Sequence, residues 1–441
     1  MVDAEASPSS IVIPTRRVSR GWVLLGSILI LLAIGVGTAF FQWRADLQVA
    51  REALARGDLQ TARNAAEHYL RYAPTSAPAH MLAGDAYFQD NSLPPLEAAD
   101  QAISHYSRIP DDSDLGSTAR LLAGRATFLV RQEPSRAERL FRRSVELNPD
   151  QFDGYYMQWQ LHNVTERYFD CEPLFREVYR LCPVESRALR LREWYSSQFT
   201  PLSACGQLDL MMQFRQDPEV PSEEIAFERL TAFCKYEPDE PNTIAALAQW
   251  HLRSESRESA LEVLDAIPHR DQAIHSQFYL ATLVETLIEV GQMERAGVEF
   301  SKWSGPVEGY QYLRIAGIHS QEVAGEMDEA VKYLTRAVNS WPGPTDWLLM
   351  NRLSRCLALQ GKRDESQRVS LEAKRVEGLT DLAIHKKVRQ ALGQLDQPDG
   401  LEEVVRFYES LHRDWEAAAW REVISDLRKS PVERRAIPPR N

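Results

Sequence analysis

Apolar and polar positions alternate with a helical period through most of this chain. Residues 310–342 show the pattern most clearly, because two apolar runs flank Gly325. In the second run, Ala330, Leu334 and Ala337 fall at spacings of four and three, which places them on one helical face. The proline that closes the stretch ends this run, since proline cannot continue a helix. The stretch therefore predicts two helices joined by a tight turn.

The same pattern recurs along the chain as a small residue, a bulky apolar residue four positions later and a proline twelve positions later. Complete copies are Ala137, Phe141 and Pro149, then Cys171, Phe175 and Pro183, and then Ala226, Leu230 and Pro238. Less complete copies contain Ala62, Ala98, Ala260, Ala296 and Ser366. This pattern resembles the tetratricopeptide (TPR) repeat, and the resemblance covers roughly three quarters of the chain. It implies about eight or nine helix pairs.

A single pair of this kind cannot bury its apolar face, so neighbouring pairs must stack into a solenoid. We therefore predict an all-α fold with a TPR-like α-α solenoid over residues 44–376. Capping helices are expected over 377–430, where helical periodicity continues but the small-residue pattern fades. The register is interrupted over 184–218. Residues 431–441, which combine proline and arginine, are expected to form a disordered basic tail.

The N-terminal region predicts a membrane anchor. Residues 1–20 are expected to be a disordered tail, and the run that follows them carries no charge up to Phe41. At a rise of about 1.5 Å per residue, such a run is long enough to cross a bilayer core as a helix. Trp22 and Trp43 stand at its two ends, where indoles prefer the membrane interface. The predicted transmembrane helix spans 21–43.

Two other interpretations of this run are open. It has the basic start of a secretory signal peptide, with a small-x-small cleavage site at residues 37–39, or it is a buried hydrophobic helix. For an anchor, three arginines close to the membrane in a short tail are hard to translocate. We therefore predict a single-pass protein with a cytoplasmic N-terminus and its repeats on the outer side, which is the periplasm if the source is bacterial.

Composition narrows the class of partner. The 441 residues carry a formal net charge of -12, and the sequence pI is about 5.5, so the charge has the wrong sign for a protein whose main ligand is a nucleic acid. The five cysteines are scattered and form no Cys-x-x-Cys pair, which favours small core residues over a disulfide framework.

No motif of enzyme chemistry stands out in the sequence. It lacks His-Glu-x-x-His, the phosphate-binding Gly-x-x-x-x-Gly-Lys, Gly-x-Ser-x-Gly and a calcium loop. His269 and His275 are the closest histidines near a turn, but they lack further ligands for a metal. We predict no catalytic residue, no cofactor and no metal, and therefore not an enzyme.

One set of polar positions is a candidate binding surface. In TPR-like stacks the first helix of each pair lines a concave groove. Equivalent positions on the first helices are all polar, and the candidate groove contacts among them are Gln160, Gln249, Glu285, His319 and Arg355, with Arg51, Asp85 and Arg125 at the same position in earlier copies. They are expected to hold an extended peptide or a helix through hydrogen bonds and charge pairs. The alternative is that they form the solvated face of amphipathic helices.

These observations predict a single-pass, membrane-anchored scaffold for protein–protein interaction, which recruits or stabilises a membrane or envelope complex. The expected partners are proteins or peptides, with the membrane bound through the N-terminal helix and no nucleic acid. One alternative is an enzyme or enzyme subunit whose site is assembled from separate repeats. Another is a membrane-tethered holdase chaperone.

Overall fold

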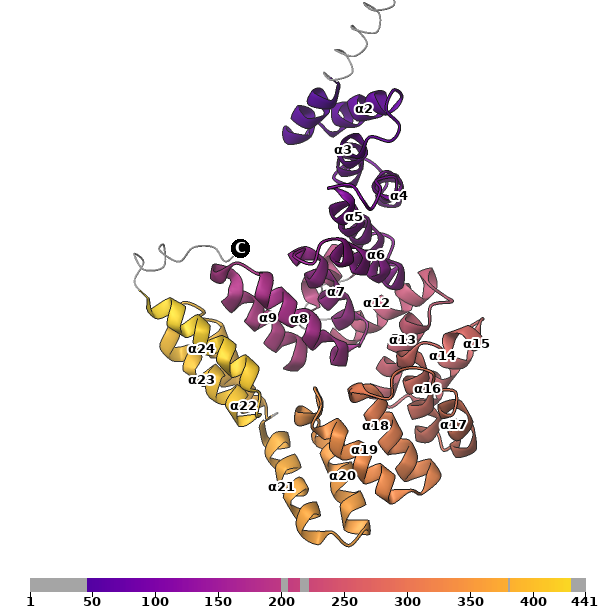
Figure 1. Ribbon diagram of the computed structural model, residues 1–441, viewed down its shortest axis with the longest axis vertical. Coiled ribbons are helices and arrows are strands. Elements are labelled where there is room, and N and C mark those ends of the chain that lie inside the picture. Colours follow the sequence, from indigo (N-terminus) through magenta and orange to yellow (C-terminus); the bar gives the residue numbers. More distant parts are fainter. Residues whose placement is uncertain (1–45, 200–204, 215–221, 380, 430–441) are drawn as a thin grey trace, which may run out of the picture. The chain divides into compact units, whose positions relative to one another are not determined.

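Every regular element in the described part of the chain is a helix (Figure 1). The structure is a computed structural model, and it describes residues 46–199, 205–214, 222–379 and 381–429. The chain divides into two compact units, residues 1–90 and 91–441. For the described residues, the predicted all-α class is confirmed.

The first unit contains a helix over residues 46–55, followed by α2 (Leu59–Leu70) and α3 (Ala77–Phe88). Asp58 begins α2, because its side chain accepts a hydrogen bond from the backbone N–H of Thr61 at 3.2 Å. The helices pack through alanines, which allow close approach. The buried alanines, including the small position of the first repeat copy, are Ala50, Ala53, Ala62, Ala66, Ala83 and Ala86.

The second unit is a succession of helices, most of them packed in pairs. Its helices up to residue 199 are α4 (Pro95–Ser107), α5 (Gly116–Leu129), α6 (Pro134–Leu147), α7 (Phe152–Val164), α8 (Cys171–Leu181) and α9 (Arg187–Phe199). The next are α11 (Gly206–Met211), α12 (Ser222–Tyr236), α13 (Pro241–Arg253), α14 (Arg257–Asp265), α15 (Arg270–Ala273), α16 (Gln277–Glu289) and α17 (Met293–Phe300).

The remaining helices are α18 (Gly309–His319), α19 (Met327–Val338), α20 (Trp347–Leu359), α21 (Arg363–Leu379), α22 (Leu382–Leu392), α23 (Pro398–Ser410) and α24 (Asp414–Arg428). Short 3₁₀ turns occur at η1 (Tyr168–Asp170), η2 (Val184–Ser186) and η4 (Gly343–Thr345), and one π-helical turn at η3 (Ser320–Ala324).

The stretch 310–342 folds as predicted into two helices, α18 and α19. Gly325 lies at the turn between them with a φ of +70°, a left-handed conformation that glycine adopts without steric cost. Ala330, Leu334 and Ala337 are fully buried on one face of α19. The spacing of small and bulky residues therefore predicted both the turn and the buried face.

Small residues lie where paired helices approach most closely. Gly124 of α5 faces Phe141 of α6, and a Cβ added at Gly124 would lie 2.6 Å from the Phe141 ring. Ala137, the small position of the same copy, is fully buried, and the rings of Phe128 and Phe141 meet edge to face with centroids 6.4 Å apart. Glycine is thus required in α5 by the aromatic ring of its partner helix.

The order of packing departs from a simple linear stack. Helix α6 packs against α13, which follows it by about a hundred residues. The carboxylate of Glu237 accepts hydrogen bonds from the backbone N–H groups of Ser135 and Arg136, both at 2.9 Å, and so caps the first turn of α6. The rings of Phe128 and Phe233 also meet, 6.3 Å apart. Helices α12 and α13 therefore continue the stack from α5–α7, not from α8 and α9.

Helices α8 and α9 instead pack against the C-terminal helices (Figure 1). The indole N–H of Trp194 donates to Glu416 at 3.1 Å. Arg413 pairs with Glu416, and its guanidinium lies 4.0 Å from the ring centroid of Trp341 and 5.1 Å from that of Tyr408. We call Trp194, Trp341, Tyr408, Arg413 and Glu416 the C-terminal clasp. It joins segments more than 200 residues apart.

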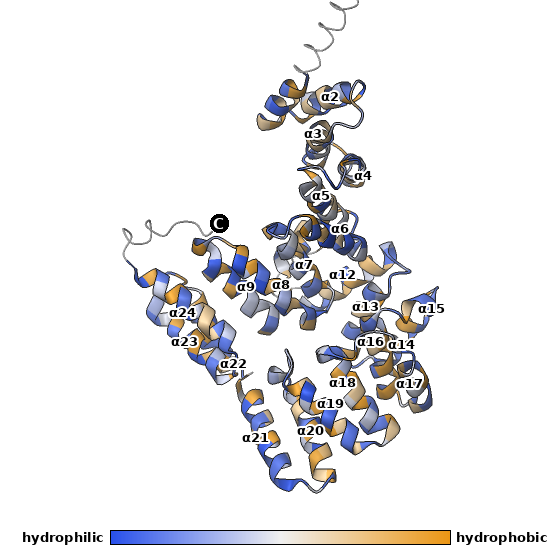
Figure 2. Ribbon diagram, in the orientation of Figure 1, coloured by the Kyte–Doolittle hydropathy of each residue, from blue (hydrophilic) through white to orange (hydrophobic). Residues whose placement is uncertain are grey.

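The predicted single-pass membrane location is contradicted by the described helices. None of them is long and apolar enough to cross a bilayer. The longest, α21, has 17 residues, fewer than the roughly 20 apolar residues that a span needs. Hydrophilic and hydrophobic residues are interspersed along the described helices, as Figure 2 shows. The predicted tail 1–20, the predicted span 21–43 and the predicted tail 431–441 lie outside the described residues.

Replacing Gly124 by alanine tests the close approach of α5 and α6. An alanine normally stabilises a helix relative to glycine, but here its methyl group would overlap the ring of Phe141. We expect Gly124→Ala to lower the free energy of unfolding by about 1–3 kcal/mol. The matched control is Gly378→Ala in α21, where a Cβ meets no atom within 4 Å; this change should stabilise by up to about 1 kcal/mol. Urea unfolding gives both values, and equal effects at the two sites would contradict the packing.

Replacing Arg413 by methionine tests the C-terminal clasp. The change leaves the Glu416 carboxylate, which is 3% exposed, without its cationic partner. We expect Arg413→Met to destabilise the second unit by about 3–5 kcal/mol. Arg406→Met, which removes an exposed arginine of α23 paired with Glu403, is the control and should cause no measurable change. A normal urea midpoint for Arg413→Met would show that the clasp does not hold the C-terminal helices.

Candidate functional site

A cavity of about 390 Å³ opens between α5, α7, α9 and α11. Its lining combines charged, amide and apolar side chains. The lining residues are Arg125, Leu129, Asp153, Tyr156, Met157, Gln160, Asn163, Arg192, Glu193, Ser196, Gln207, Leu208 and Met211. The cavity draws on α5 and α7, which are the first helices of two pairs, and on α9 and α11.

Two arginines that line the cavity stand out by their contacts within the described chain. Among the described residues, neither Arg125 of α5 nor Arg192 of α9 makes an ion pair or a hydrogen bond. Both are half-buried, and the Nε atom of Arg125 is fully enclosed without an acceptor. Gln160 of α7 is 8% exposed, and its amide also has no partner in the described part of the chain. Three residues with hydrogen-bonding side chains thus line one cavity without a hydrogen-bond partner in the described chain.

The carboxylates of the lining form no ion pair with these two arginines, although the charge of Arg192 acts on the neighbouring Glu193. Glu193 is paired with Arg190 at 2.5 Å, and that guanidinium also lies over the ring of Tyr156, 4.9 Å from its centroid. Burial raises the pKa of Glu193, although Arg190 opposes the shift. Asp153 is exposed in the first turn of α7. Two unpaired guanidinium groups therefore face a single unpaired carboxylate.

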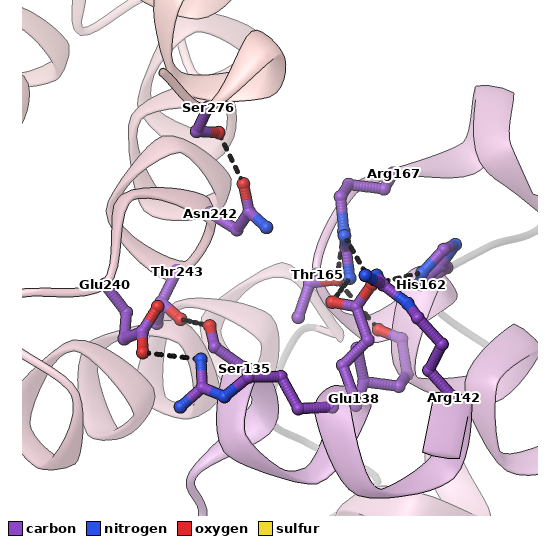
Figure 3. A network of polar contacts seen from close by, with 12 residues as sticks. Ser135, Glu138, Arg142, His162, Thr165, Arg167, Glu240, Asn242, Thr243 and Ser276 are labelled. Carbon is purple, nitrogen blue, oxygen red and sulfur yellow. Dashed lines mark hydrogen bonds and ion pairs between the residues drawn. The ribbon is translucent and has the colours of Figure 1, made fainter. Parts of the chain in front are cut away.

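A buried ionic network fixes α7 behind the cavity (Figure 3). Glu138 of α6 accepts from Arg167 at 2.6 Å and from Arg142 at 2.9 Å, and it lies 3.4 Å from Nε2 of His162. Arg167 also donates to the hydroxyl of Thr165 at 3.3 Å. His162 belongs to the same helix as Gln160, so the network holds the helix that carries the cavity amides.

A second group of contacts in Figure 3 joins this region to the helices that follow it in the stack. The hydroxyls of Ser135 and Thr243 are 3.1 Å apart. Arg139 pairs with Glu240 at 2.9 Å, and Ser276 donates to Asn242 at 2.6 Å. These contacts run from α6 through α13 to the start of α16 and keep the wall of the cavity aligned with the later repeats.

The network shifts the proton affinities of its members. Burial by itself would raise the pKa of Glu138, but Arg167 and His162 outweigh it and hold that pKa well below its ordinary value. Burial lowers the pKa of His162, and the positive charge of Arg167 adds to the effect. The folded protein therefore keeps Glu138 ionised and His162 neutral at neutral pH.

Of the predicted groove contacts, the structure brings Gln249 and Glu285 together. The Gln249 amide donates to Thr282 at 3.1 Å and to Glu285 at 3.4 Å. Arg314 of the next first helix donates to the same Glu285 carboxylate at 2.9 Å. Burial opposes this carboxylate's ionisation, yet Arg314 and Gln249 lower its pKa. Here polar groups on successive first helices satisfy one another.

The other predicted residues lie elsewhere. Gln160 lines the cavity, together with Arg125 from the same set of positions. The ring of His319 stacks on Phe300, with centroids 4.3 Å apart, and Arg355 is exposed on α20. The predicted membrane-interface residues Trp22 and Trp43 lie outside the described residues. The groove contacts stay predictions, but they do not share one environment.

Sequence reasoning missed Arg192 and the residues of α11. Both fall in the interval 184–218, where the repeat register is interrupted, so no equivalent position pointed to them. A weak signal was present in Gln207 and Leu208, which continue a helical pattern after the break at Pro201. Proximity to α5 and α7, however, follows only from the fold.

Acid unfolding tests the network around Glu138. A carboxyl with a depressed folded pKa stabilises the fold above its ordinary value of 4.5, and a histidine with a lowered pKa does so above 6.5. We therefore expect the free energy of unfolding to fall as pH drops below about 6.5 and more steeply below about 4.5.

The matched variants isolate this effect. Glu138→Gln should flatten the dependence below pH 4.5, where its carboxylate would otherwise take up a proton on unfolding. Glu403→Gln, which removes an exposed carboxylate of α23, should leave the profile unchanged. Urea titrations between about pH 2.5 and pH 8 measure the slopes, and identical slopes below pH 4.5 for Glu138→Gln and the parent chain would contradict the assignment.

No protein-family profile matches this chain, and no curated protein is similar to it. Among similar solved structures, the Cut9–Hcn1 hetero-tetramer of the APC/C is 11% identical, with 86% of each chain covered and a TM-score of 0.34. A tetratricopeptide repeat protein from Parabacteroides merdae is 12% identical over 59% of this chain and 91% of its own, with a TM-score of 0.29. PilF of Pseudomonas aeruginosa is 13% identical over 52% and 94%, with a TM-score of 0.26. The described helices of this chain pack in successive pairs, as the resemblance to TPR proteins predicted.

Proposed function

We propose that this chain is a protein-interaction scaffold that binds a segment of its partner in the cavity between α5, α7, α9 and α11. One observation carries the proposal: Arg125, Arg192 and Gln160 line the same cavity and have no partner within the described chain. Buried polar groups in folded proteins are almost always hydrogen-bonded. A bound segment would supply the missing acceptors and would recruit or stabilise the complex to which it belongs.

The cavity favours binding over catalysis. Among the described residues, its lining contains no histidine and no cysteine, and the carboxylate of Glu193 is already paired with Arg190. General acid–base or nucleophilic chemistry needs such groups within hydrogen-bond reach of each other. The mixture of arginine, amide and apolar side chains also differs from the apolar groove that a holdase would use. The enzyme and holdase alternatives stay predictions.

The proposed site is smaller than the groove that the sequence suggested. Gln249 and Glu285 already satisfy each other together with Arg314, so binding a partner there would first break existing contacts. At Arg125 and Arg192 no such contact has to be broken. The support for a scaffold therefore concentrates on the α5–α11 region.

Site-specific photo-crosslinking tests the function in cells. A benzoylphenylalanine replaces Leu210, which is 63% exposed on α11 beside the cavity, and in a second strain it replaces Leu371, which is 61% exposed on α21. We expect a short, reproducible set of crosslinked proteins from Leu210 that is absent from Leu371. The same proteins from both positions, or none from Leu210, would contradict a partner site at this cavity.

A further inference from the structure

The charged residues that line the cavity determine which ligand charge the cavity can balance. Arg125 and Arg192 contribute two positive charges, the exposed Asp153 contributes one negative charge, and Glu193 is neutralised by Arg190. The cavity therefore has an excess of one positive charge. A guanidinium presents a planar fork of N–H donors that matches the two oxygens of a carboxylate. A single carboxylate balances this site, whereas a dianion would leave one negative charge uncompensated.

The amide side chains add donors of the same kind. Asn163 accepts a hydrogen bond from the thiol of Cys171 through Oδ1 at 3.3 Å, which leaves its NH₂ group as the donor available to the cavity. Gln160, nine-tenths buried and without a partner in the described chain, lies on the same helix. Helix α7 therefore offers amide N–H donors in addition to the two guanidinium groups of α5 and α9. A ligand group that only accepts hydrogen bonds is complementary to all of these donors.

Helix α11 contributes apolar side chains to the cavity, and an ion pair fixes it to α12. Leu208 and Met211 of α11 line the cavity, and Leu210 is exposed at the same short helix. The buried ion pair between Asp209 and Arg229 ties α11 to α12, and the two side chains are 4% and 2% exposed. An apolar side chain next to the carboxylate of a bound segment would cover the exposed area of Met211 and Leu210.

We infer that the cavity recognises an internal acidic residue of a partner protein, Asp or Glu, with a large apolar residue next to it in sequence. This inference rests on the proposed function and names the chemistry of the segment that the scaffold binds. The carboxylate lies between Arg125 and Arg192, and the apolar side chain packs on α11. A C-terminal acidic residue or a phosphorylated residue brings a second negative charge that this cavity does not balance.

Peptide selection on the purified full-length chain tests the inference. Random 12-residue segments are displayed between fixed neutral flanks, so that no segment has a free terminus. We expect enrichment of Asp or Glu adjacent to Leu, Ile, Met or Phe. An enriched peptide is then made with an acetylated N-terminus, an amidated C-terminus and a fluorophore, and its binding is followed by fluorescence anisotropy.

Charge-removing variants locate the bound peptide. Arg125→Met and Arg192→Met keep most of the apolar stem, and each should weaken binding by about ten-fold, with a smaller salt dependence. Arg368→Met removes an exposed arginine of α21 and is the matched control, with unchanged affinity expected. Met211→Ser should weaken peptides that carry the apolar residue, while peptides with glycine in its place should bind equally weakly to the parent chain and to this variant. Circular dichroism melts confirm that each variant is folded.

Several outcomes overturn the inference. Enriched peptides without an acidic residue do so, as does equal binding to the parent chain and to the Arg125→Met and Arg192→Met variants. Tighter binding of the same peptide with a free C-terminal acid or a phosphoserine would show that the cavity favours a second negative charge, which contradicts the inference. If no peptide is enriched but Leu210 crosslinks a partner, the acidic segment is wrong and the scaffold function stands. If peptide selection enriches no peptide and crosslinking from Leu210 gives no partner, both the inference and the proposed scaffold function are wrong.

Discussion

Each helix pair of this chain has two apolar faces that must be buried against other helices. Where the next pair in sequence does not bury a face, helices from elsewhere in the chain must do so. Helices α12 and α13 pack on α5–α7, where Glu237 caps α6 and Phe233 meets Phe128. That arrangement leaves the far face of α8 and α9 open. The C-terminal helices cover it through the clasp of Trp194, Arg413 and Glu416. The C-terminal helices thus pack where they do because α8 and α9 separate from the helices that continue the stack.

Dividing the stack also creates the cavity. Helix α9 belongs to the pair that leaves the stack, whereas α11 leads into the helices that continue it. Because these two helices pack on different cores, the space between them and α5 and α7 is not filled by the next repeat. Arg125, Arg192 and Gln160 line that space. An interrupted repeat, which weakens a prediction of regular structure, is here the source of the candidate site.

Local spacing predicted much of the fold. The intervals between Ala330, Leu334 and Ala337 identified a buried face, and Gly325 identified a turn, because both depend only on helical geometry and on backbone sterics. The clasp was not predictable, since Trp194 and Glu416 are 222 residues apart and nothing in their local sequence indicates pairing. Arg192 was missed for a related reason, because its importance depends on α5 and α11 meeting around it.

The polar positions on the first helices illustrate the same distinction. Where first helices follow one another directly, as in α13, α16 and α18, the side chain of one reaches the next, and Gln249, Glu285 and Arg314 form a continuous set of hydrogen bonds. Beside the break after α9, Arg125 and Gln160 make no such hydrogen bond in the described chain, although α5 and α7 pack together. Residue type is therefore a poor guide to binding, because an arginine or glutamine at the same repeat position is structural in one place and available in another. A polar residue at this position is structural when a side chain on a neighbouring helix lies within hydrogen-bonding distance, and it is available for binding when none does.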